Sequence, residues 1–577
     1  MVGCGTDRPG ASPRCAAGAR ANRAGRQRPH RNALRSMATS RMLRGGGGPP
    51  SSDTACKTTM DTEKTNASLT TRTAWILFGK IVSFALSFAL PLMLVRKMSQ
   101  SEYGLYKQAF LVVSTAYTIL PLGFGLSAFY FLPRETEERR RAVLFNILAF
   151  YFVMGAVAIL ALLLFPGSFA NLLISDQVAA TDPNIRAQIV SLAPLIGSAV
   201  FFWLFSSFLE QVALANQETK MATFFIIVAQ FTKSIMLIVA AGFWGSVVAL
   251  LYAATAQGVL QTIILLAYLQ SRFPGFWHSV DFGVLKKQLL YALPFGMAGL
   301  LWKIQIDIHN YFVSFNFGQT GFAVYSVGVF QLPLLGILNE SIASVMIPRM
   351  SYLQGVNDKQ EIIRLWNSVA RKMALFYFAT YAALSVMSRD FIVALFTDQY
   401  LASIPIFLLN MIILPTSIFP LDPICRAYQS LGRFLPKFRI VLFVLLMGGL
   451  TYVTRFQDLR LVIGLVVAIN AFETFFLTWK AAGAIGTRFL DLLPLRELGR
   501  LAGASLISAA LVFVAQRALA GYGLPAIVML GIGSAIFGSA YLALLFAFGA
   551  LAREERDLIQ SYVDKAMLIF NRGARQS

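Results

Sequence analysis

A long series of apolar segments dominates this chain. Fourteen stretches of about 17 to 27 mostly apolar residues follow one another between Ala74 and Ala550, with short loops between them. The hydrocarbon core of a bilayer is about 30 Å thick and takes about 20 helical residues to cross, and backbone polar groups inside it must be hydrogen-bonded within the segment. The pattern therefore predicts an all-α polytopic membrane protein with about 14 transmembrane helices.

The predicted spans have edges that are uncertain by several residues. They cover residues 74–95, 108–131, 142–165, 189–209, 221–243, 246–268, 289–315, 323–347, 368–388, 401–421, 438–454, 460–479, 501–519 and 524–550.

Basic residues collect in every second loop, and this sets the predicted orientation. The loops of one set, with the C-terminal tail, hold 26 Arg and Lys residues, counting Arg439, while the other set holds eight. Because cytoplasmic loops carry the excess of basic residues, both termini are predicted to be cytoplasmic. The net charge of +22 is then explained by these loops and by a basic tail, so nucleic-acid binding is not expected.

The N-terminal 70 residues form a predicted disordered tail. Residues 1–72 hold 13 basic and four acidic residues, include a run of four glycines and lack an apolar core that could act as a secretory signal. An organellar transit peptide is one alternative, and an over-extended start with Met60 as the true first residue is favoured over it. Three of the four cysteines fall in this tail and none forms a C-x-x-C pair, so neither a disulfide framework nor a metal site is expected.

An internal repeat is visible at an offset of 215 to 219 residues. Residues 99–106 (SQSEYGLY) are similar to residues 318–325 (GQTGFAVY), and two further pairs of similar segments have nearly the same offset. The repeat divides the chain into a first six-helix bundle at 71–285, a second at 286–500, a terminal helix pair at 501–552 and a tail at 553–577. Parallel repeats of this kind place a substrate cavity between the halves, with alternating access; chance similarity of amphiphilic loops is the alternative.

Several short motifs resemble a known family. Residues 78–80 (FGK), 96–106 (RKMSQSEYGLY), 325–328 (YSVG), 347–351 (IPRMS) and 395–400 (LFTDQY) resemble the polysaccharide-transporter and O-antigen flippase families of the multidrug/oligosaccharidyl-lipid/polysaccharide (MOP) exporter superfamily. The resemblance covers residues 70 to about 500 and rests on loop and small-residue signatures, so it identifies the superfamily better than the substrate.

The resemblance implies a fold, a transport function, a membrane location and partners. It implies two six-helix bundles with a final helix pair, and export of a polyprenyl-diphosphate-linked oligosaccharide, an O-antigen or exopolysaccharide repeat unit, across the bacterial cytoplasmic (inner) membrane. The expected partner is the lipid-linked oligosaccharide, and a polysaccharide polymerase with chain-length machinery could cooperate. No catalytic residue and no cofactor are expected, while coupling to H⁺ or Na⁺ is compatible with the family.

Ionisable residues inside predicted spans are the candidate functional residues, because such groups are costly in lipid and usually face a cavity or a partner. A cationic cavity would offset part of the desolvation cost of a diphosphate, and the spans that resemble the cavity-lining set are 1, 7 and 8. The candidate cavity cations are Lys80, Lys303 and Lys233; the candidates for ion or proton coupling are Asp307, Glu340, Glu473 and His309.

Lys303 and Asp307 allow two interpretations. They are four residues apart, hence on one helical face, and could simply neutralise each other. Alternatively, substrate could compete for Lys303 and free Asp307 for a proton or Na⁺. Lys233 could likewise pair with a neighbouring helix instead of lining the cavity.

Three rival functions remain open. A lipid II flippase shares the expected fold and an anionic lipid-linked substrate, and an ion-coupled multidrug antiporter belongs to the same superfamily. A membrane glycosyltransferase or polymerase is a distant alternative, because the longest outer loop, about 166–188, offers only Asp176 and Asp182 as acids.

Overall fold

The computed structural model describes residues 90–278, 281–330, 332–551 and 556. Within these ranges every regular element is a helix, as the hydropathy pattern predicts. The predicted tail at 1–70, most of the first predicted span and Lys80 lie outside the described residues.

The helices of the first half follow in chain order. They are α2 (Gln100–Ile119), η1 (Phe124–Leu126), α3 (Ser127–Phe131), α4 (Glu137–Leu164), α5 (Pro166–Leu173), α6 (Asp176–Thr181), α7 (Asn184–Ser206), α8 (Phe208–Ala215), α9 (Thr219–Phe243), α10 (Val247–Arg272) and η2 (Phe276–His278).

The second half and the terminal pair complete the described chain. Their helices are α11 (Phe282–Gly328), α12 (Pro333–Gly355), α13 (Lys359–Val386), α14 (Ser388–Phe396), η3 (Asp398–Ser403), α15 (Ile404–Met411), α16 (Ile413–Thr416), α17 (Leu421–Ala427), α18 (Gln429–Val453), η4 (Thr454–Phe456), α19 (Leu459–Ile485), η5 (Phe489–Leu492), α20 (Leu495–Leu519), η6 (Ala520–Tyr522) and α21 (Ala526–Ala547).

The chain is a multi-pass membrane protein. Among the described residues, nine helices are long and apolar enough to span a bilayer, or up to 12 if each of three bent pairs forms one span. The predicted count of 14 includes the span at 74–95, which lies mostly outside those residues, so the exact number stays a prediction.

Helices of matching length recur in the same order in the two halves. α4 and α13 each have 28 residues, and the short pair α5 and α6 is matched by α14 and η3. α9 and α18 each have 25 residues, and α10 with 26 is matched by α19 with 27. This order supports the repeat found in the sequence, while the bundle boundaries at 285 and 500 stay predictions.

The repeated SQSEYGLY and GQTGFAVY segments begin a helix in different ways. Ser99 caps α2 in a capping box: the Glu102 amide donates to its hydroxyl at 3.3 Å, and its own amide donates to the Glu102 carboxylate at 2.9 Å. The equivalent Gly318 interrupts α11 with φ 67° and ψ −165°, a conformation open to glycine. The corresponding segment thus begins with a side-chain cap in one half and with a glycine interruption in the other.

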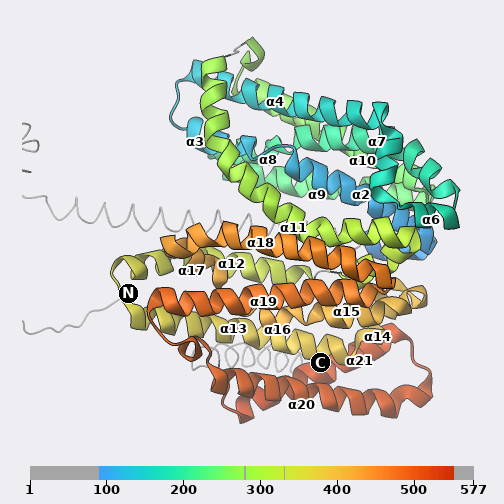
Figure 1. Cartoon of the computed structure of the whole chain (residues 1–577), viewed down its shortest axis with the longest axis vertical. Coiled ribbons are helices and arrows are strands. Elements are labelled where there is room, and N and C mark those ends of the chain that lie inside the picture. Colours follow the sequence, from blue (N-terminus) through green and yellow to red (C-terminus); the bar gives the residue numbers. More distant parts are fainter. Residues whose placement is uncertain (1–89, 279–280, 331, 552–555, 557–577) are drawn as a thin grey trace, which may run out of the picture. The chain divides into compact units, whose positions relative to one another are not determined.

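The halves contact each other at the end of the bundle that is poor in basic residues. We call this the opposite end, and the end formed by the Arg- and Lys-rich loops the basic end. At the opposite end the Ser101 hydroxyl donates to Gln319 at 2.7 Å, and the Gln108 amide donates to the Ser314 hydroxyl at 2.9 Å. Figure 1 shows α2 lying against α11. The first of these bonds joins the repeated segments themselves, and the second lies beside them.

Arg96 adds a second connection at the opposite end. Its guanidinium donates to the carbonyl oxygens of Ala394 at 2.6 Å and Leu395 at 3.2 Å, in the last turn of α14. A cation there also complements the negative end of the helix dipole. First-half Arg96 is therefore bound to the second half.

One predicted span is broken in the structure. The prediction of one continuous span at 323–347 is wrong, because α11 ends at Gly328 and α12 begins at Pro333; proline lacks the N–H that a helix interior needs. The predicted span at 401–421 corresponds to the candidate membrane span Asp398–Thr416, which is made up of η3, α15 and α16.

The terminal helices pack on the second half. The Tyr541 hydroxyl of α21 donates to the Leu375 carbonyl of α13 at 2.8 Å, and Gln516 of α20 donates to Asp390 of α14 at 2.5 Å. Met387, Val512 and Phe537 meet in one buried apolar cluster. The predicted terminal pair is thus attached to α13 and α14.

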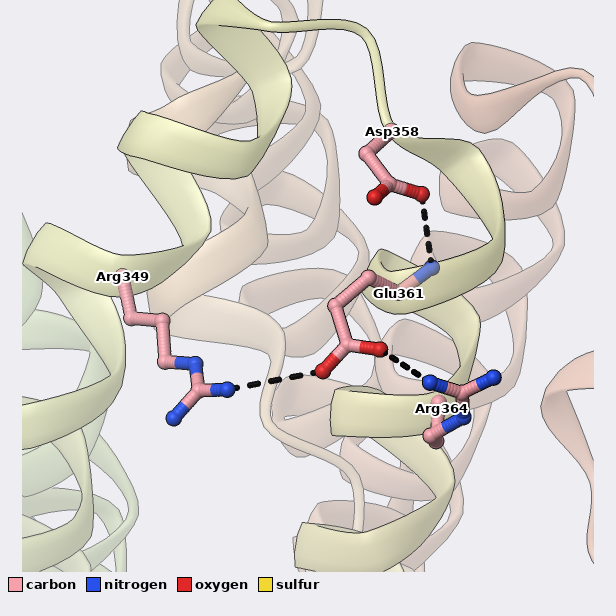
Figure 2. Close-up of polar contacts among 4 residues, drawn as sticks. All are labelled: Arg349, Asp358, Glu361 and Arg364. Atoms are coloured by element: carbon pink, nitrogen blue, oxygen red, sulfur yellow. Dashed lines mark hydrogen bonds and ion pairs between the residues drawn. The ribbon is translucent and has the colours of Figure 1, made fainter. Parts of the chain in front are cut away.

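The turn between α12 and α13, at the basic end, is fixed by charged groups. Asp358 caps α13 by accepting the Glu361 amide at 3.1 Å. The Glu361 carboxylate then accepts from Arg364 at 2.5 Å and from Arg349 of α12 at 3.4 Å (Figure 2). Both guanidinium groups remain largely exposed, so one carboxylate holds two cations at this surface.

Candidate functional site

Helix α11 positions the charged residues predicted for span 7. It bends by 43° between its segments Phe282–Pro294 and Gly299–Gly328, and Pro294 lies at this bend because proline cannot donate the helical hydrogen bond. Lys303 and Asp307 follow the bend on one face, and their ammonium and carboxylate groups form an ion pair at 2.7 Å. The pairing expected from the i,i+4 spacing is therefore present.

Asp307 also contacts the first half. The Thr115 hydroxyl of α2 donates to Oδ2 of Asp307 at 3.0 Å, the same oxygen that pairs with Lys303. Only 10% of the Asp307 side chain is exposed, against 23% for Lys303. A nearly buried carboxylate thus receives one donor from each half, so its protonation would alter contacts on both sides.

A second buried ion pair lies between α18 and α19. Nε of Arg439 is 3.0 Å from Oε1 of Glu473, and the Gln305 amide of α11 donates to Oε2 of Glu473 at 3.4 Å. The exposed fractions are 32% for the Arg439 side chain and 12% for that of Glu473. Glu473, a sequence candidate for ion or proton coupling, is therefore paired and is tied to α11.

A polar cavity of about 670 Å³ joins these groups inside the second half. Its lining comes from α11, α12, α15, α17, α18 and α19; the polar members include Gln305, Asp307, His309, Asn310, Asn339, Asn410, Asp422, Arg439, Asn470 and Glu473. Oδ1 of Asn470 is buried without a hydrogen-bond partner among the described residues. Such an oxygen calls for water or a cation in the cavity.

A second cavity lies on another face of α11. It has a volume of about 620 Å³ and is lined mostly by apolar groups, among them Tyr311, Phe315 and Met447, with Thr115 at its edge. Asp307 lines both cavities. The carboxylate therefore stands between a polar space and an apolar space.

His309 belongs to the polar cavity, but Glu340 does not. Nδ1 of His309 lies 2.8 Å from the Tyr325 hydroxyl, beyond the Gly318 interruption of the same helix. Glu340 is exposed on α12, and only its neighbour Asn339 lines the cavity. The structure thus brings Asp307, His309 and Glu473 together around one cavity and leaves Glu340 outside it.

Lys233 lies apart from these residues, in a cavity of about 180 Å³ within the first half. Its ammonium is 4.1 Å from the centre of the Trp203 ring, in a cation–π contact. Glu210, Gln257 and Gln261 line the same cavity. The structure does not unite Lys233 with Lys303, and the sequence alternative of a partner on a neighbouring helix fits the contact with Trp203 of α7.

The two polar cavities occupy related places in the repeat. Glu210 and Asp422 are 212 residues apart, as are Gln261 and Glu473, and so are the first residues of α10 and α19. In the first half an acid precedes α9, a cation (Lys233) lies on α9 and a polar residue lies on α10. In the second half an acid precedes α18, a cation (Arg439) lies on α18 and a polar residue lies on α19. The second half alone has a carboxylate at the last of these positions.

Sequence reasoning missed Arg439, Gln305 and Asn470. Arg439 was counted with the basic loops although it lies at the start of the predicted span 438–454, whereas α18 begins at Gln429 and includes Pro436. Gln305 was passed over as uncharged, although it lies between Lys303 and Asp307 in the sequence. A search for amides as well as charges within spans would have found it and Asn470.

Comparisons with known proteins agree with this architecture. A family model described as "Polysaccharide biosynthesis protein" matches residues 93–405. The solved structure of the lipid II flippase MurJ, in an inward closed conformation, is similar over 85% of this chain and 99% of that chain, with a TM-score of 0.63 at 14% identity. No curated protein sequence matches the chain.

A second solved structure shows the same fold. It is a multidrug resistance MATE family transporter of the MOP superfamily in an inward-facing conformation, similar over 70% of this chain and 94% of that chain, with a TM-score of 0.55 at 15% identity. At such identities the likeness establishes the fold alone. The chain therefore has the helical fold of MOP superfamily transporters, as the sequence motifs suggest.

Proposed function

Because the chain belongs to the polysaccharide biosynthesis protein family and has the fold of MOP superfamily transporters, we propose that it is a flippase for polyprenyl-diphosphate-linked oligosaccharide. The cargo is an O-antigen or exopolysaccharide repeat unit, carried across the cytoplasmic membrane by alternating access. The family match over residues 93–405 is the observation that carries this proposal.

Lys303 is the proposed partner of the diphosphate. A phosphate group crossing the low-dielectric layer is stabilised by a cation, and the Lys303 ammonium is already partly desolvated beside Asp307. Lys80 on the first predicted span is the second proposed cation. The lipid tail would stay in the bilayer, so only the head group needs a polar path.

Asp307 is the proposed coupling group. When the diphosphate binds Lys303, the Asp307 carboxylate loses its ion pair and becomes available to a proton or Na⁺. Glu473, His309 and the unpartnered Asn470 oxygen line the same cavity and supply further oxygen or nitrogen groups for that ion. Thr115 would transmit the change to the first half, because its bond to Asp307 crosses between the halves.

A lipid II flippase is the second candidate. The observation that favours it is the similarity to MurJ, which extends over 99% of that chain. The two candidates carry the same anionic lipid diphosphate and differ in the attached glycan.

Deletion and complementation test the proposal. The deletion strain is expected to lose surface polysaccharide and to accumulate the polyprenyl-linked unit in the inner leaflet, with rescue by the wild-type chain but not by Lys303→Ala. Lys437→Ala, which removes an exposed lysine at the basic end, serves as the matched control and should rescue fully. Normal polysaccharide with altered drug or dye efflux would overturn the flippase proposal, and lysis from failed wall synthesis would favour the lipid II candidate.

A further inference from the structure

A fourth cavity opens at the basic end, outside the site described above. It has a volume of about 610 Å³ and is formed by the start of α18, the end of α19 and the segment that leads into η5. Its lining includes two cations, two hydroxyl groups and two aromatic rings; these are Lys480, Arg488, Ser430, Thr487, Trp479 and Phe489. None of the polar cavity's charged residues takes part in it.

The cations of this cavity are not neutralised by its own lining. Lys480 forms no ion pair among the described residues, and its ammonium lies 4.6 Å from the centre of the Phe434 ring. The Asp491 carboxylate accepts from the Thr487 hydroxyl at 2.7 Å and from the backbone N–H of Arg488 at 3.0 Å. One carboxylate therefore lies beside Arg488. Lys359 adds another cation nearby, with its ammonium 2.9 Å from the position of a Cβ on Gly486.

An aromatic seam leads from the cavity along the outside of the bundle. Phe472, Phe475 and Trp479 follow one another at spacings of three and four on α19, and about half of each side chain is exposed. Neighbouring rings on α18 and α19 form a series that ends at Trp479, with centre-to-centre distances of 5.4 Å for Phe434–Phe438, 4.7 Å for Phe438–Phe476 and 5.6 Å for Phe476–Trp479. α18 and α19 lie side by side (Figure 1).

We infer that this cavity binds the phosphate head group of an anionic glycerophospholipid, whose acyl chains lie along the aromatic seam. Basic pockets between helices at the cytoplasmic surface favour such head groups, and exposed tryptophan is typical of the membrane interface. Lys480 and Arg488 supply the charge, Ser430 supplies a hydroxyl donor, and the seam offers apolar contact only to a molecule with a lipid tail. A free phosphate has no apolar tail that could contact that seam.

The cavity is separate from the proposed path of the substrate. It contains no α11 residue, whereas Lys303 and Asp307 both lie on α11. Its occupant would instead bridge α18 and α19, the two helices that carry Arg439 and Glu473. The bound phospholipid would therefore hold these helices together and does not need to move through the protein.

Native mass spectrometry of the purified full chain tests this inference. The protein would be exposed to cardiolipin, phosphatidylglycerol, phosphatidylcholine or polyprenyl diphosphate in detergent, and retained lipid measured for the wild type and for Lys480→Ala/Arg488→Ala. Each cation near a membrane surface is worth about 1 kcal/mol, or about fivefold in affinity. The double variant removes two cations, so its affinity for anionic phospholipid should fall about 25-fold. Phosphatidylcholine binding should not change.

Two matched variants separate this site from general charge effects. Arg433→Ala/Lys437→Ala removes two exposed cations from the same end without touching the cavity, and should retain anionic lipid. Lys480→Arg/Arg488→Lys keeps the charge and should also retain it, which controls for folding. Equal loss in both alanine pairs, or no loss in either, would overturn the inference; so would a loss confined to polyprenyl diphosphate, which would assign the cavity to the substrate.

Discussion

The two halves of this protein share an order of helices but differ in the charge they place inside the bundle. The first half surrounds Lys233 with an indole ring and glutamine side chains, with Glu210 nearby. The second half has a nearly buried Arg439–Glu473 ion pair and connects it through Gln305 to α11, which also carries Asp307. Among the described residues, the carboxylate at position 473 of the second half has a glutamine, Gln261, at the related position of the first half, and the second half is the copy we propose to couple transport to an ion.

Breaking the Arg439–Glu473 pair is expected to have the largest effect. Glu473→Gln removes the carboxylate that lies 3.0 Å from Nε of the partly buried Arg439, and removal of one partner of a buried pair costs about 3–5 kcal/mol. The double variant Arg439→Leu/Glu473→Leu should recover most of that loss, because it removes both charges of the pair. Thermal unfolding of the purified variants in detergent measures both. A single variant as stable as the wild type would show that water in the cavity already solvates the arginine.

The contact between the halves at the opposite end gives the next effect. A Cβ on Gly104 would lie 1.9 Å from the Gln319 carbonyl oxygen, so Gly104→Ala must push α2 away from α11, at about 1–3 kcal/mol. Residue 323 is the equivalent position in the second half, where an alanine is fully buried. Ala323→Gly should cost about 0.5–1 kcal/mol, through helix propensity.

Cross-linking between cysteines at residues 101 and 319 measures this contact. Its yield should fall in Gly104→Ala and stay high in Ala323→Gly. Unchanged yield in both variants would mean that the close approach of Gly104 does not hold the halves together.

A carboxylate placed at position 261 tests whether the two halves differ because of the residue at this position. Gln261→Glu reproduces the chemistry of Glu473 at the related position and removes the 3.3 Å bond from Gln261 to the Thr232 hydroxyl. The expected cost is about 1 kcal/mol, the net contribution of one hydrogen bond. Ion dependence of transport should not change, because α11 does not line this cavity. A new ion dependence would show that the halves are functionally equivalent.

The smallest expected effect is at the surface cluster of Figure 2. Glu361→Gln removes the carboxylate from Arg349 and Arg364, whose side chains are 61% and 73% exposed. Exposed pairs contribute about 0–1 kcal/mol and are screened by salt. The unfolding temperature should therefore change more between low and high salt in the wild type than in the variant. A salt-independent loss would point to the helix turn instead of the charges.

The sequence predicts the class of fold and the order of helices, but not where helices break. Apolar length sets the number and spacing of the spans, so the all-helical architecture and the internal repeat were accessible. The break at 329–332 and the passage of α18 through Pro436 were not, because a proline is tolerated or disruptive according to the neighbours that satisfy the freed backbone groups.

The candidate site was predictable to the extent that charge marks it. Asp307, His309 and Glu473 were selected as ionisable groups in apolar segments, and all three line one cavity. Arg439 and Asn470 were missed because their roles depend on the start of a helix and on tertiary contacts with α19 and α11. Lys233 shows the opposite case, since charge alone could not say that its cavity lies within the first half.

Translocation in proteoliposomes tests the central proposal most directly. A fluorescent polyprenyl-diphosphate oligosaccharide would be loaded in one leaflet, and its transfer measured for the wild type and for Asp307→Asn, with and without an imposed H⁺ or Na⁺ gradient. The proposal predicts that the wild type accelerates transfer in response to one gradient, and that Asp307→Asn loses this response while remaining folded. Failure of the wild type to move the lipid, or an Asp307→Asn protein that still responds to the gradient, would contradict it.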